Sequence, residues 1–333
     1  MQLDGKTAIV TGGGSGFGAG IARAFAAAGA RVLVADINGD GHLDIYISQG
    51  GSSHTPWSDK ANLLFINNGD LTFTESAQQY GLDDTNISTQ AAFFDYDKDG
   101  DLDCVVLNES KYTHVVHAEV FKDLKIKGNL ERASSHLFRN DNGHFKRVTT
   151  EAGMLHWGFG LGLAVSDFNE DGWPDIYIAN DYAIPDKMFI NNGDGTFTDQ
   201  IKEKTKQISF YSMGIDIADI NNDGLQEIAV VDMAADDHVR GKTLMASMDI
   251  PTFWYHINTR KFHYQYMFNS MQLNNGNNTY SNIANMAGVA QTDWSWASLL
   301  ADFDNDGYKD YFVSNGYRRY ARDNDFRIKM AKE

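Results

Sequence analysis

The chain repeats one acidic nonapeptide five times, with the pattern Asp-x-Asn/Asp-x-Asp-Gly-x-x-Asp/Glu. Each copy places oxygen-bearing side chains at positions 1, 3, 5 and 9, and a glycine at position 6 permits a sharp turn. Oxygen ligands at this spacing are typical of a loop folded around a hard cation, and Ca²⁺ is the cation that we expect. The predicted ligands are Asp36, Asn38, Asp40, Asp44, Asp95, Asp97, Asp99, Asp103, Asp167, Asn169, Asp171, Asp175, Asp219, Asn221, Asp223, Glu227, Asp302, Asp304, Asp306 and Asp310.

The second and fifth loops carry a carboxylate at all four ligand positions, in the segments Asp95 to Asp103 and Asp302 to Asp310. Because ligand charge raises affinity, these two loops are predicted to bind calcium most tightly. The loop at Asp219 has Glu227 at position 9 and is expected to bind more weakly. The histidines do not form a spaced ligand set, so the predicted role of the metal is structural and no catalytic residue is assigned.

Composition restricts the class of protein and of partner. The 333 residues carry a net charge of −17, which excludes nucleic acid because its phosphates would be repelled. No stretch approaches the ~20 apolar residues of a membrane span. The single cysteine, Cys104, rules out an intrachain disulfide. Residues 1–6 do not resemble a secretion signal, so the chain as written is expected in the cytoplasm.

Each acidic loop lies between two apolar segments, and this placement predicts the tip of a β-hairpin. Position 12 is apolar and β-branched in every copy, whereas an EF-hand needs a glutamate there and flanking helices. EF-hand and dockerin-like loops are therefore excluded. The five residues at position 12 are Ile47, Val106, Ile178, Val230 and Val313.

A second signature alternates with the acidic loops. Asn-Gly turns at Asn68-Gly69, Asn142-Gly143, Asn192-Gly193 and Asn275-Gly276 are followed by an aromatic residue and indicate tight hairpins. A calcium-type hairpin and an Asn-Gly hairpin give about four strands per repeat, which is one blade of a β-propeller. From residue 36 onward the pattern is all-β.

Residues 36–333 resemble the FG-GAP/VCBS repeat family, which is related to the integrin α-subunit propeller. The segments 178–181, 188–197, 294–297 and 315–319 are typical of it. The resemblance implies a calcium-stabilised propeller that is secreted or surface-exposed and that acts in binding or adhesion. Five loops at unequal intervals leave three alternatives for this propeller: open, incomplete, or closed by the N-terminal strand.

Residues 1–35 have a different character, with a strand, a Gly-rich turn, a helix and a second strand. This segment resembles the first βαβ unit of short-chain dehydrogenases/reductases, whose glycine motif is matched by Thr11, Gly12, Gly16 and Gly18. The resemblance implies a place for NAD, with Asp36 on the adenosine ribose. None of the tyrosines has a lysine four residues later, so the catalytic Tyr-x-x-x-Lys of that family is absent.

The predicted organisation is a chimera of a truncated Rossmann-like segment, 1–35, and a repeat propeller, 36–333. The leading hypothesis is a non-enzymatic calcium-binding module for protein or glycan. An NAD-dependent oxidoreductase is the alternative, and a propeller-type polysaccharide lyase is a third reading. The insertion between Asp232 and Met267, with Phe253-Trp254-Tyr255 and three histidines, is either a ligand-facing surface or packing. Asp36 is assigned to calcium.

Overall fold

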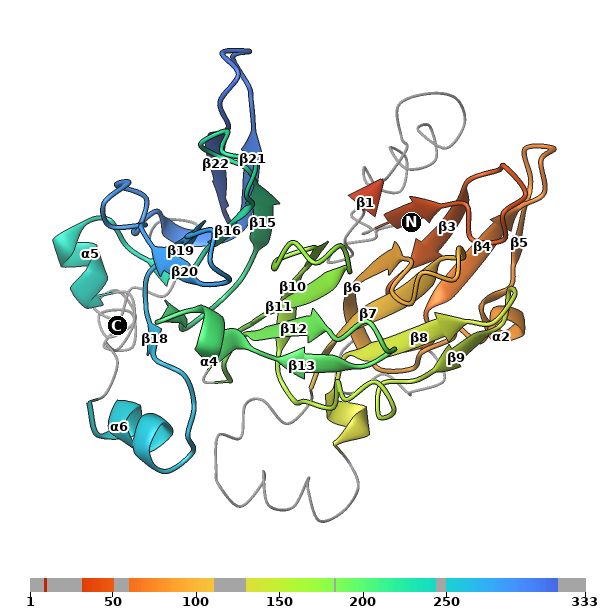
Figure 1. The fold of residues 1–333 in the computed structure, drawn as a ribbon, viewed down its shortest axis with the longest axis horizontal. Helices are drawn as coiled ribbons and strands as arrows, with labels where there is room; N and C mark the ends of the chain where they lie inside the picture. The colour runs from red at the N-terminus through yellow and green to blue at the C-terminus, as the bar shows by residue number, and fades with distance from the viewer. Residues whose placement is uncertain are drawn as a thin grey trace, which may run out of the picture. The chain divides into compact units, whose positions relative to one another are not determined.

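The computed structural model describes residues 9–10, 32–50, 60–110, 130–182, 184–243 and 250–316, without the side chains of 9–10 and 32–35. The chain is mainly β, as predicted, and it is built from small and mostly antiparallel sheets (Figure 1). Its residues gather into two compact units. The first comprises Met1–Asp167, Asp171–Asp175 and Ile190–Thr198, and the second comprises Phe168–Glu170, Ile176–Phe189 and Asp199–Glu333.

Two repeat sheets lie in the first unit. Each consists of a hairpin with an acidic loop at its turn, followed by a hairpin with an Asn-Gly turn, as the sequence predicts. The first sheet contains β1 (Ile9–Val10), β2 (Val32–Ala35), β3 (Asp44–Ile47), β4 (Leu63–Asn67) and β5 (Phe73–Glu75), in that order. The second contains β6 (Ile87–Phe94), β7 (Asp103–Glu109), β8 (His136–Asn140) and β9 (Phe145–Arg147).

The third and fourth repeat sheets have the same strand order, and the fifth is shorter. The third contains β10 (Gly160–Ser166), β11 (Asp175–Asn180), β12 (Lys187–Asn191) and β13 (Phe197–Asp199). The fourth contains β15 (Ile215–Ala218), β16 (Glu227–Val230), β19 (Ser270–Asn274) and β20 (Tyr280–Asn282). The fifth contains β17 (Met233–Ala234), β21 (Asp293–Ala301) and β22 (Asp310–Asn315), while β14 (Ile208–Ser209) pairs in parallel with β18 (Gln265–Tyr266).

Short helices lie between the strands, so the expectation of an all-β chain after residue 36 was wrong in detail. They are α2 (Ala77–Tyr80), the 3₁₀ helix η2 (Glu131–Ala133), α4 (Ile201–Lys204), α5 (His238–Thr243) and α6 (Ile250–Asn258). The last two lie in the insertion that the sequence marks out by its aromatic residues. α6 buries only His256, although Ile250, Phe253, Trp254 and Ile257 recur at the spacing of an apolar helical stripe.

The strand that follows each of the first four acidic loops is the central and most buried strand of its sheet. All four residues of β3 and all six of β11 are buried. In the first unit, Tyr46 packs edge-to-face on Phe93, with ring centroids 5.6 Å apart, in a core that includes Leu64 and Val106. Burial on both faces explains why these segments are continuous apolar runs rather than alternating ones.

The strand β2 belongs to two patterns at once. It pairs in parallel with β1, placing Ile9 opposite Leu33, and antiparallel with β3, placing Leu33 opposite Tyr46. A parallel neighbour is what a βαβ unit requires, and an antiparallel neighbour is what a hairpin requires. The dehydrogenase-like segment and the repeat region therefore share this strand, because its residue pattern fits the second strand of a βαβ unit and also the first strand of a repeat hairpin.

Candidate metal centres

The five acidic loops adopt one backbone conformation. Positions 4 and 6 of each copy have positive φ, a region that favours glycine. At position 6 the φ values are 86° for Gly41, 100° for Gly100, 88° for Gly172, 89° for Gly224 and 92° for Gly307. At position 4 a glycine stands only in the first loop; the residues are Gly39, Lys98, Glu170, Asn222 and Asn305, with φ between 59° and 72°. The common fold of the loop is therefore held by interactions other than glycine freedom alone.

The carboxylate at position 1 organises the loop. In the first copy the backbone N–H groups of Asp40 and Gly41 donate to the two oxygens of Asp36, at 3.1 and 2.9 Å. The same pair of bonds recurs at Asp167, Asp219 and Asp302. The N–H of position 7 then donates to position 5, as His42 does to Asp40 at 2.8 Å. These bonds close the loop into a turn and bring the side chains of positions 1, 3 and 5 to the same side of it.

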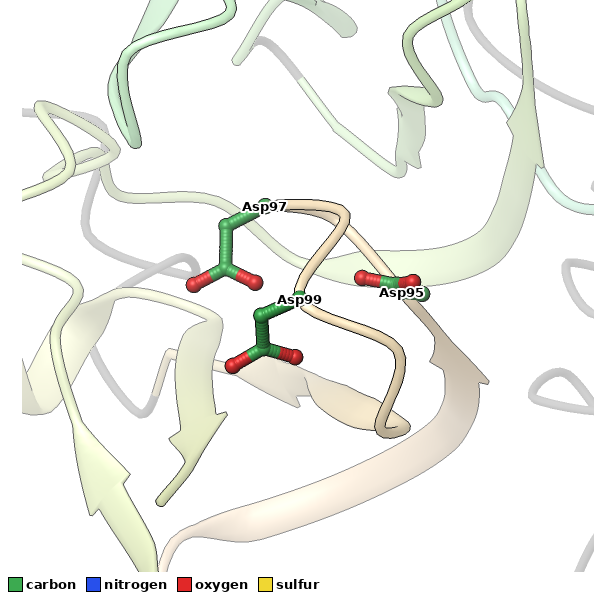
Figure 2. Close-up of side chains that lie close together, drawn as sticks. All are labelled: Asp95, Asp97 and Asp99. Atoms are coloured by element: carbon green, nitrogen blue, oxygen red, sulfur yellow. The ribbon is translucent and has the colours of Figure 1, made fainter. Parts of the chain in front are cut away.

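The second loop brings three carboxylates together. Asp95, Asp97 and Asp99 each offer an oxygen, and these oxygens all lie within 4.8 Å of one another (Figure 2). One oxygen of Asp95 and one of Asp97 are shielded from solvent and accept no hydrogen bond. Burial raises the pKa of Asp97, and the charge of Asp99 raises it further. Shielded anionic oxygens without donors fit a bound hard cation, which would supply the missing partner.

The fifth loop forms a second carboxylate cluster. Asp302, Asp304 and Asp310 place oxygens within 4.8 Å of one another. The remaining three loops contain an asparagine at position 3, and in the first and fourth loops its amide joins the turn. In the first of them Asn38 donates to Asp40 at 2.9 Å, and its own oxygen accepts the Asp40 N–H at 3.1 Å. All five loops thus keep the oxygen-rich side chains of the prediction on one turn.

The carboxylate at position 9 has a further task. Asp44, Asp103 and Asp175 are fully buried. In the first loop Asp44 accepts two backbone N–H groups, each at 2.9 Å. One belongs to Ile37 and the other to Asn67, the last residue of β4. In the second and third sheets Asn140 and Asn191 donate the equivalent bond, at 2.8 and 2.7 Å. Position 9 therefore ties the acidic loop to the Asn-Gly hairpin of the same repeat.

A second contact, which recurs in each of the first four repeats, escaped sequence reasoning. In each case a short polar side chain lies directly before the first strand of the Asn-Gly hairpin, which is β4, β8, β12 or β19. It accepts the backbone N–H of the residue five positions after the position-9 acid. The pairs are Asn62 with Gln49 at 2.7 Å, Ser135 with Asn108 at 3.3 Å, Asp186 with Asn180 at 2.8 Å and Asn269 with Asp232 at 2.7 Å. We call these four side chains the strand clamps. Their signal in the sequence is a polar residue five positions before the Asn that precedes the Asn-Gly turn.

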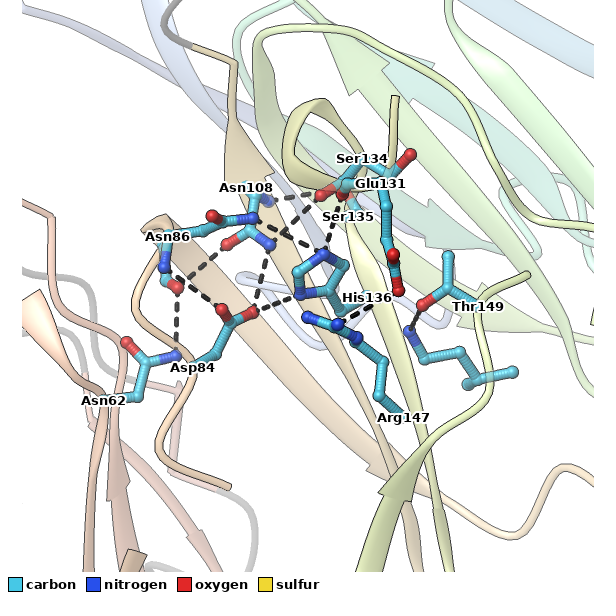
Figure 3. Close-up of polar contacts among 12 residues, drawn as sticks. Asn62, Asp84, Asn86, Asn108, Glu131, Ser134, Ser135, His136, Arg147 and Thr149 are labelled. Carbon is cyan, nitrogen blue, oxygen red and sulfur yellow. Dashed lines mark hydrogen bonds and ion pairs between the residues drawn. The ribbon is translucent and has the colours of Figure 1, made fainter. Parts of the chain in front are cut away.

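In the second repeat the clamp sits within a larger buried network (Figure 3). His136 Nδ1 and Asp84 Oδ2 are 2.6 Å apart, and Asn108 donates to the same Asp84 oxygen at 3.2 Å. Burial by itself would raise the pKa of Asp84, but the hydrogen bond and charge of His136, together with hydrogen bonds from Asn86 and Asn108, lower it. Because the pair is buried and its hydrogen-bonding groups face other protein groups, the network holds strands rather than a ligand.

A cleft of about 580 Å³ opens beside the first two acidic loops. Its lining includes Asp36, Asn38, Asp101, Asn142 and His144, with the ring of Tyr80 at the end of α2. Carboxylates, amides and an imidazole in one hollow offer both hydrogen-bond donors and acceptors. Such a lining suits a polar ligand.

The nucleotide motif receives no support from the geometry of Asp36. Thr11, Gly12, Gly16 and Gly18 lie outside the described residues. Asp36, which the dehydrogenase pattern would place on a ribose, has both oxygens bonded within the first acidic loop. The strand β3 beside β2 runs antiparallel, whereas a dinucleotide crevice needs neighbouring parallel strands.

Repeated antiparallel sheets with acidic turn loops define a repeat protein. The FG-GAP-like repeat family matches residues 36–106 and 167–230, and the short-chain dehydrogenase family matches residues 6–55. The chain therefore carries FG-GAP-like repeats behind a dehydrogenase-like N-terminal segment, and both predicted resemblances are confirmed.

Individual relatives divide in the same way. Integrin alpha-3 of Mus musculus is 36% identical over 83 residues, which are 22% of this chain and 8% of the integrin. The 7alpha-hydroxysteroid dehydrogenase of Escherichia coli K12 is 60% identical over 40 residues, 12% of this chain and 16% of the enzyme. The chain thus spans less than a fifth of the length of either relative. Among solved structures, an Agrocybe aegerita lectin aligns at a TM-score of 0.45 and 18% identity, over 85% of this chain and 59% of the lectin.

In the described ranges of the chain, no helix is both long enough and apolar enough to cross a membrane.

Proposed function

We propose that residues 36–333 form a calcium-binding β-propeller that acts as a non-enzymatic binding or adhesion module for a protein or a glycan. The observation that carries this proposal is the Asp95–Asp97–Asp99 cluster, whose shielded oxygens have no hydrogen-bond donor among the described residues. The repeat match and the integrin likeness support a module of the binding and adhesion type, with an extracellular or surface location.

The proposed role of calcium is to stabilise the repeats. The loop carboxylates repel one another, and this repulsion contributes to the raised pKa values of Asp97 and Asp103, the latter reaching about 7 chiefly through burial. A cation would remove the repulsion and, through the position-9 acid, hold the acidic loop against the Asn-Gly hairpin. A ligand present at a hundredfold excess over its dissociation constant stabilises a fold by about 2.7 kcal/mol.

The test is thermal unfolding of the full chain after chelation and after addition of millimolar calcium, together with calorimetric calcium titration. We expect calcium to raise Tm. Asp95→Ala, at the position that is aspartate in all five loops, should remove one calcium equivalent and part of that rise, while Glu151→Gln, which removes an exposed charge outside the loops, should do neither. An unchanged Tm in the wild-type chain would refute the calcium proposal.

The oxidoreductase alternative has its own test. Calorimetric titration with NAD should give no heat of binding, because Asp36 is engaged in the acidic loop and β3 runs antiparallel beside β2 where a dinucleotide crevice needs a parallel strand. A saturable heat would restore that alternative. Binding to a glycan array, compared with and without chelator, tests whether the partner is a sugar.

A further inference from the structure

The strands that enter neighbouring acidic loops are tied to each other by side chains. β6 enters the second loop and β10 the third, and the Gln90 side chain bonds the N–H and the carbonyl oxygen of Leu163, at 3.1 and 3.3 Å. β15 enters the fourth loop and β21 the fifth, and Asp216 accepts the N–H of Leu300 at 2.6 Å. The second and third loops therefore form one pair of neighbours, and the fourth and fifth loops form another.

In the pair formed by the fourth and fifth loops, one side chain reaches directly from loop to loop. Asn222, at position 4 of the fourth loop, donates its amide N–H to the carbonyl oxygen of Gly307 at 2.9 Å. Gly307 is position 6 of the fifth loop, and the N–H of the same peptide group, which belongs to Tyr308, donates to Asp306 at 2.8 Å. Asp306 is the predicted ligand at position 5. One peptide group therefore joins Asn222 to a calcium ligand of the neighbouring loop.

Asn222 is itself positioned by the ligands of its own loop. Its φ is 59°, in a region that a residue other than glycine occupies at an energetic cost. The peptide group that follows it donates the N–H of Asp223 to two predicted ligands, Asp219 at 3.1 Å and Asn221 at 3.0 Å. When a bound cation fixes these two ligands, Asn222 is fixed with them. The contacts thus run from the ligands of the fourth loop to Asp306 in the fifth.

The pair formed by the second and third loops repeats this placement with different chemistry. Lys98, at position 4 of the second loop, also has a φ of 59°, and its ammonium lies 4.1 Å from the centre of the Trp173 ring. Trp173 is position 7 of the third loop, and its N–H donates to the predicted ligand Asp171 at 2.8 Å. A Cβ added to Gly172, at position 6, would lie 3.5 Å from the Lys98 nitrogen. In both pairs, position 4 of one loop therefore lies against positions 6 and 7 of the next.

We infer that calcium binding is cooperative within each of these two pairs of loops, and that Asn222 and Lys98 couple the paired sites. The inference rests on the calcium proposal and adds that the paired loops do not bind independently. With calcium bound in one loop, the position-4 side chain is held against the next loop, whose position-5 ligand is then already oriented. Because linkage is reciprocal, occupancy of either loop raises the calcium affinity of the other by the same factor. A single hydrogen bond such as that of Asn222 corresponds to about a threefold change in affinity.

The first and fifth loops supply matched substitutions. Position 4 of the first loop is Gly39, with a φ of 72°, so glycine already occupies this position in the same protein. Asn222→Gly therefore removes the coupling side chain and keeps a residue that accepts positive φ. Asn305→Gly is the control, because Asn305 is the same residue at position 4 of the fifth loop, with a φ of 61°. Its side chain is exposed and, within the described ranges, bonds no other loop.

The experiment measures calcium binding at each loop separately. The N–H of the position-6 glycine donates to the position-1 carboxylate of its own loop, as that of Gly307 does to Asp302 at 2.9 Å. Calcium titration of the full chain, labelled with ¹⁵N-glycine and followed by NMR, therefore gives a midpoint for each loop. Asp219→Ala, which disables the fourth loop, should raise the calcium concentration at the Gly307 midpoint about threefold. The same change should have no effect in an Asn222→Gly background and should keep its full effect in an Asn305→Gly background.

The outcomes separate failure of the coupling from failure of the calcium proposal. If no position-6 glycine responds to calcium, both are wrong. A Gly307 signal that responds to calcium but is insensitive to Asp219→Ala overturns the coupling alone, as does an Asp219→Ala effect that persists in Asn222→Gly. Asn222→Gly by itself gives a second test that does not need Asp219→Ala to fold. It should raise the Gly307 midpoint about threefold and leave that of Gly100, in the second loop, unchanged; an unchanged Gly307 midpoint overturns the inference.

Discussion

Asp186 is a strand clamp whose charge the fold does not need. It is fully buried, and its Oδ1 accepts the N–H of Asn180 at 2.8 Å. Its Oδ2 accepts the hydroxyls of Tyr177 and Ser212, at 2.8 and 3.0 Å. The clamps of the other repeats are the neutral residues Asn62, Ser135 and Asn269. Asp186→Asn should keep the bond to Asn180, and both hydroxyls can turn to accept from the new amide.

The expected gain in stability depends on pH. Burial raises the pKa of Asp186 from 3.8 to about 7. Between these values the folded chain keeps a proton that the unfolded chain releases, so the stability that the protonated carboxyl contributes is lost as pH rises through about 7. A shift of about 3 units at 1.36 kcal/mol per unit corresponds to about 4 kcal/mol. Asp186→Asn should therefore match the wild type near pH 4 and exceed it by about 4 kcal/mol at pH 8.

Urea unfolding followed by tryptophan fluorescence, in steps from pH 4 to pH 8, measures this difference. Both proteins are compared at each pH, so other titrating groups contribute equally to both. The control, Glu151→Gln, removes an exposed carboxyl and should show no difference that changes with pH. A stability difference that stays constant from pH 4 to pH 8, or an Asp186→Asn variant that is less stable at pH 8, would refute this reasoning.

Three further predictions concern single positions. Gly81→Ala should cost about 3 kcal/mol, because φ is 79° and the new Cβ would lie 2.4 Å from the Phe145 carbonyl oxygen, whereas Gly143→Ala, with φ of 85° and open space, should cost about 1 kcal/mol in the same urea assay. Asn269→Ala should cost about 3 kcal/mol, because Asn269 is buried and its amide bonds three partners; a loss below about 1 kcal/mol would contradict the clamp. Burial raises the pKa of the Cys104 thiol, so it should react with an aromatic disulfide reagent only after unfolding, and labelling of the native chain would disprove its burial.

The sequence predicted the features that are local along the chain. Each acidic loop closes within nine residues, and each Asn-Gly turn within a few more, so residue type and spacing are enough to predict both hairpins. The apolar runs after the loops likewise predicted strands, such as β3 and β11, and the structure shows that these strands are central and buried. Position 12 carried the most information, since an apolar residue there excluded helix-flanked loops.

The features that the sequence did not reveal are contacts with backbone amides or with residues far away in the chain, and neither kind of partner can be recognised from residue type. The strand clamps are Asn, Ser or Asp, which are interchangeable because each only has to accept one backbone N–H. Asp84 and His136 meet across 52 positions of the chain, and nothing local links them. The helix α6 was missed although Ile250, Phe253, Trp254 and Ile257 have helical spacing, because its aromatic residues drew attention to a surface rather than to a helix. The sequence also did not show that each position-9 acid bonds both its own loop and the Asn-Gly hairpin, because the donors are backbone amides.

The bonds through the position-9 acids also set how early a repeat can close during synthesis. The donors to Asp44, Asp103 and Asp175 follow them by only 23, 37 and 16 residues. Short loops close at low entropic cost, and contacts of low sequence separation favour fast folding. The residues joined by these bonds therefore leave the ribosome close together, whereas packing between sheets, such as Tyr46 on Phe93, has to wait for the next repeat. The order of the repeats along the chain is then also an order in time.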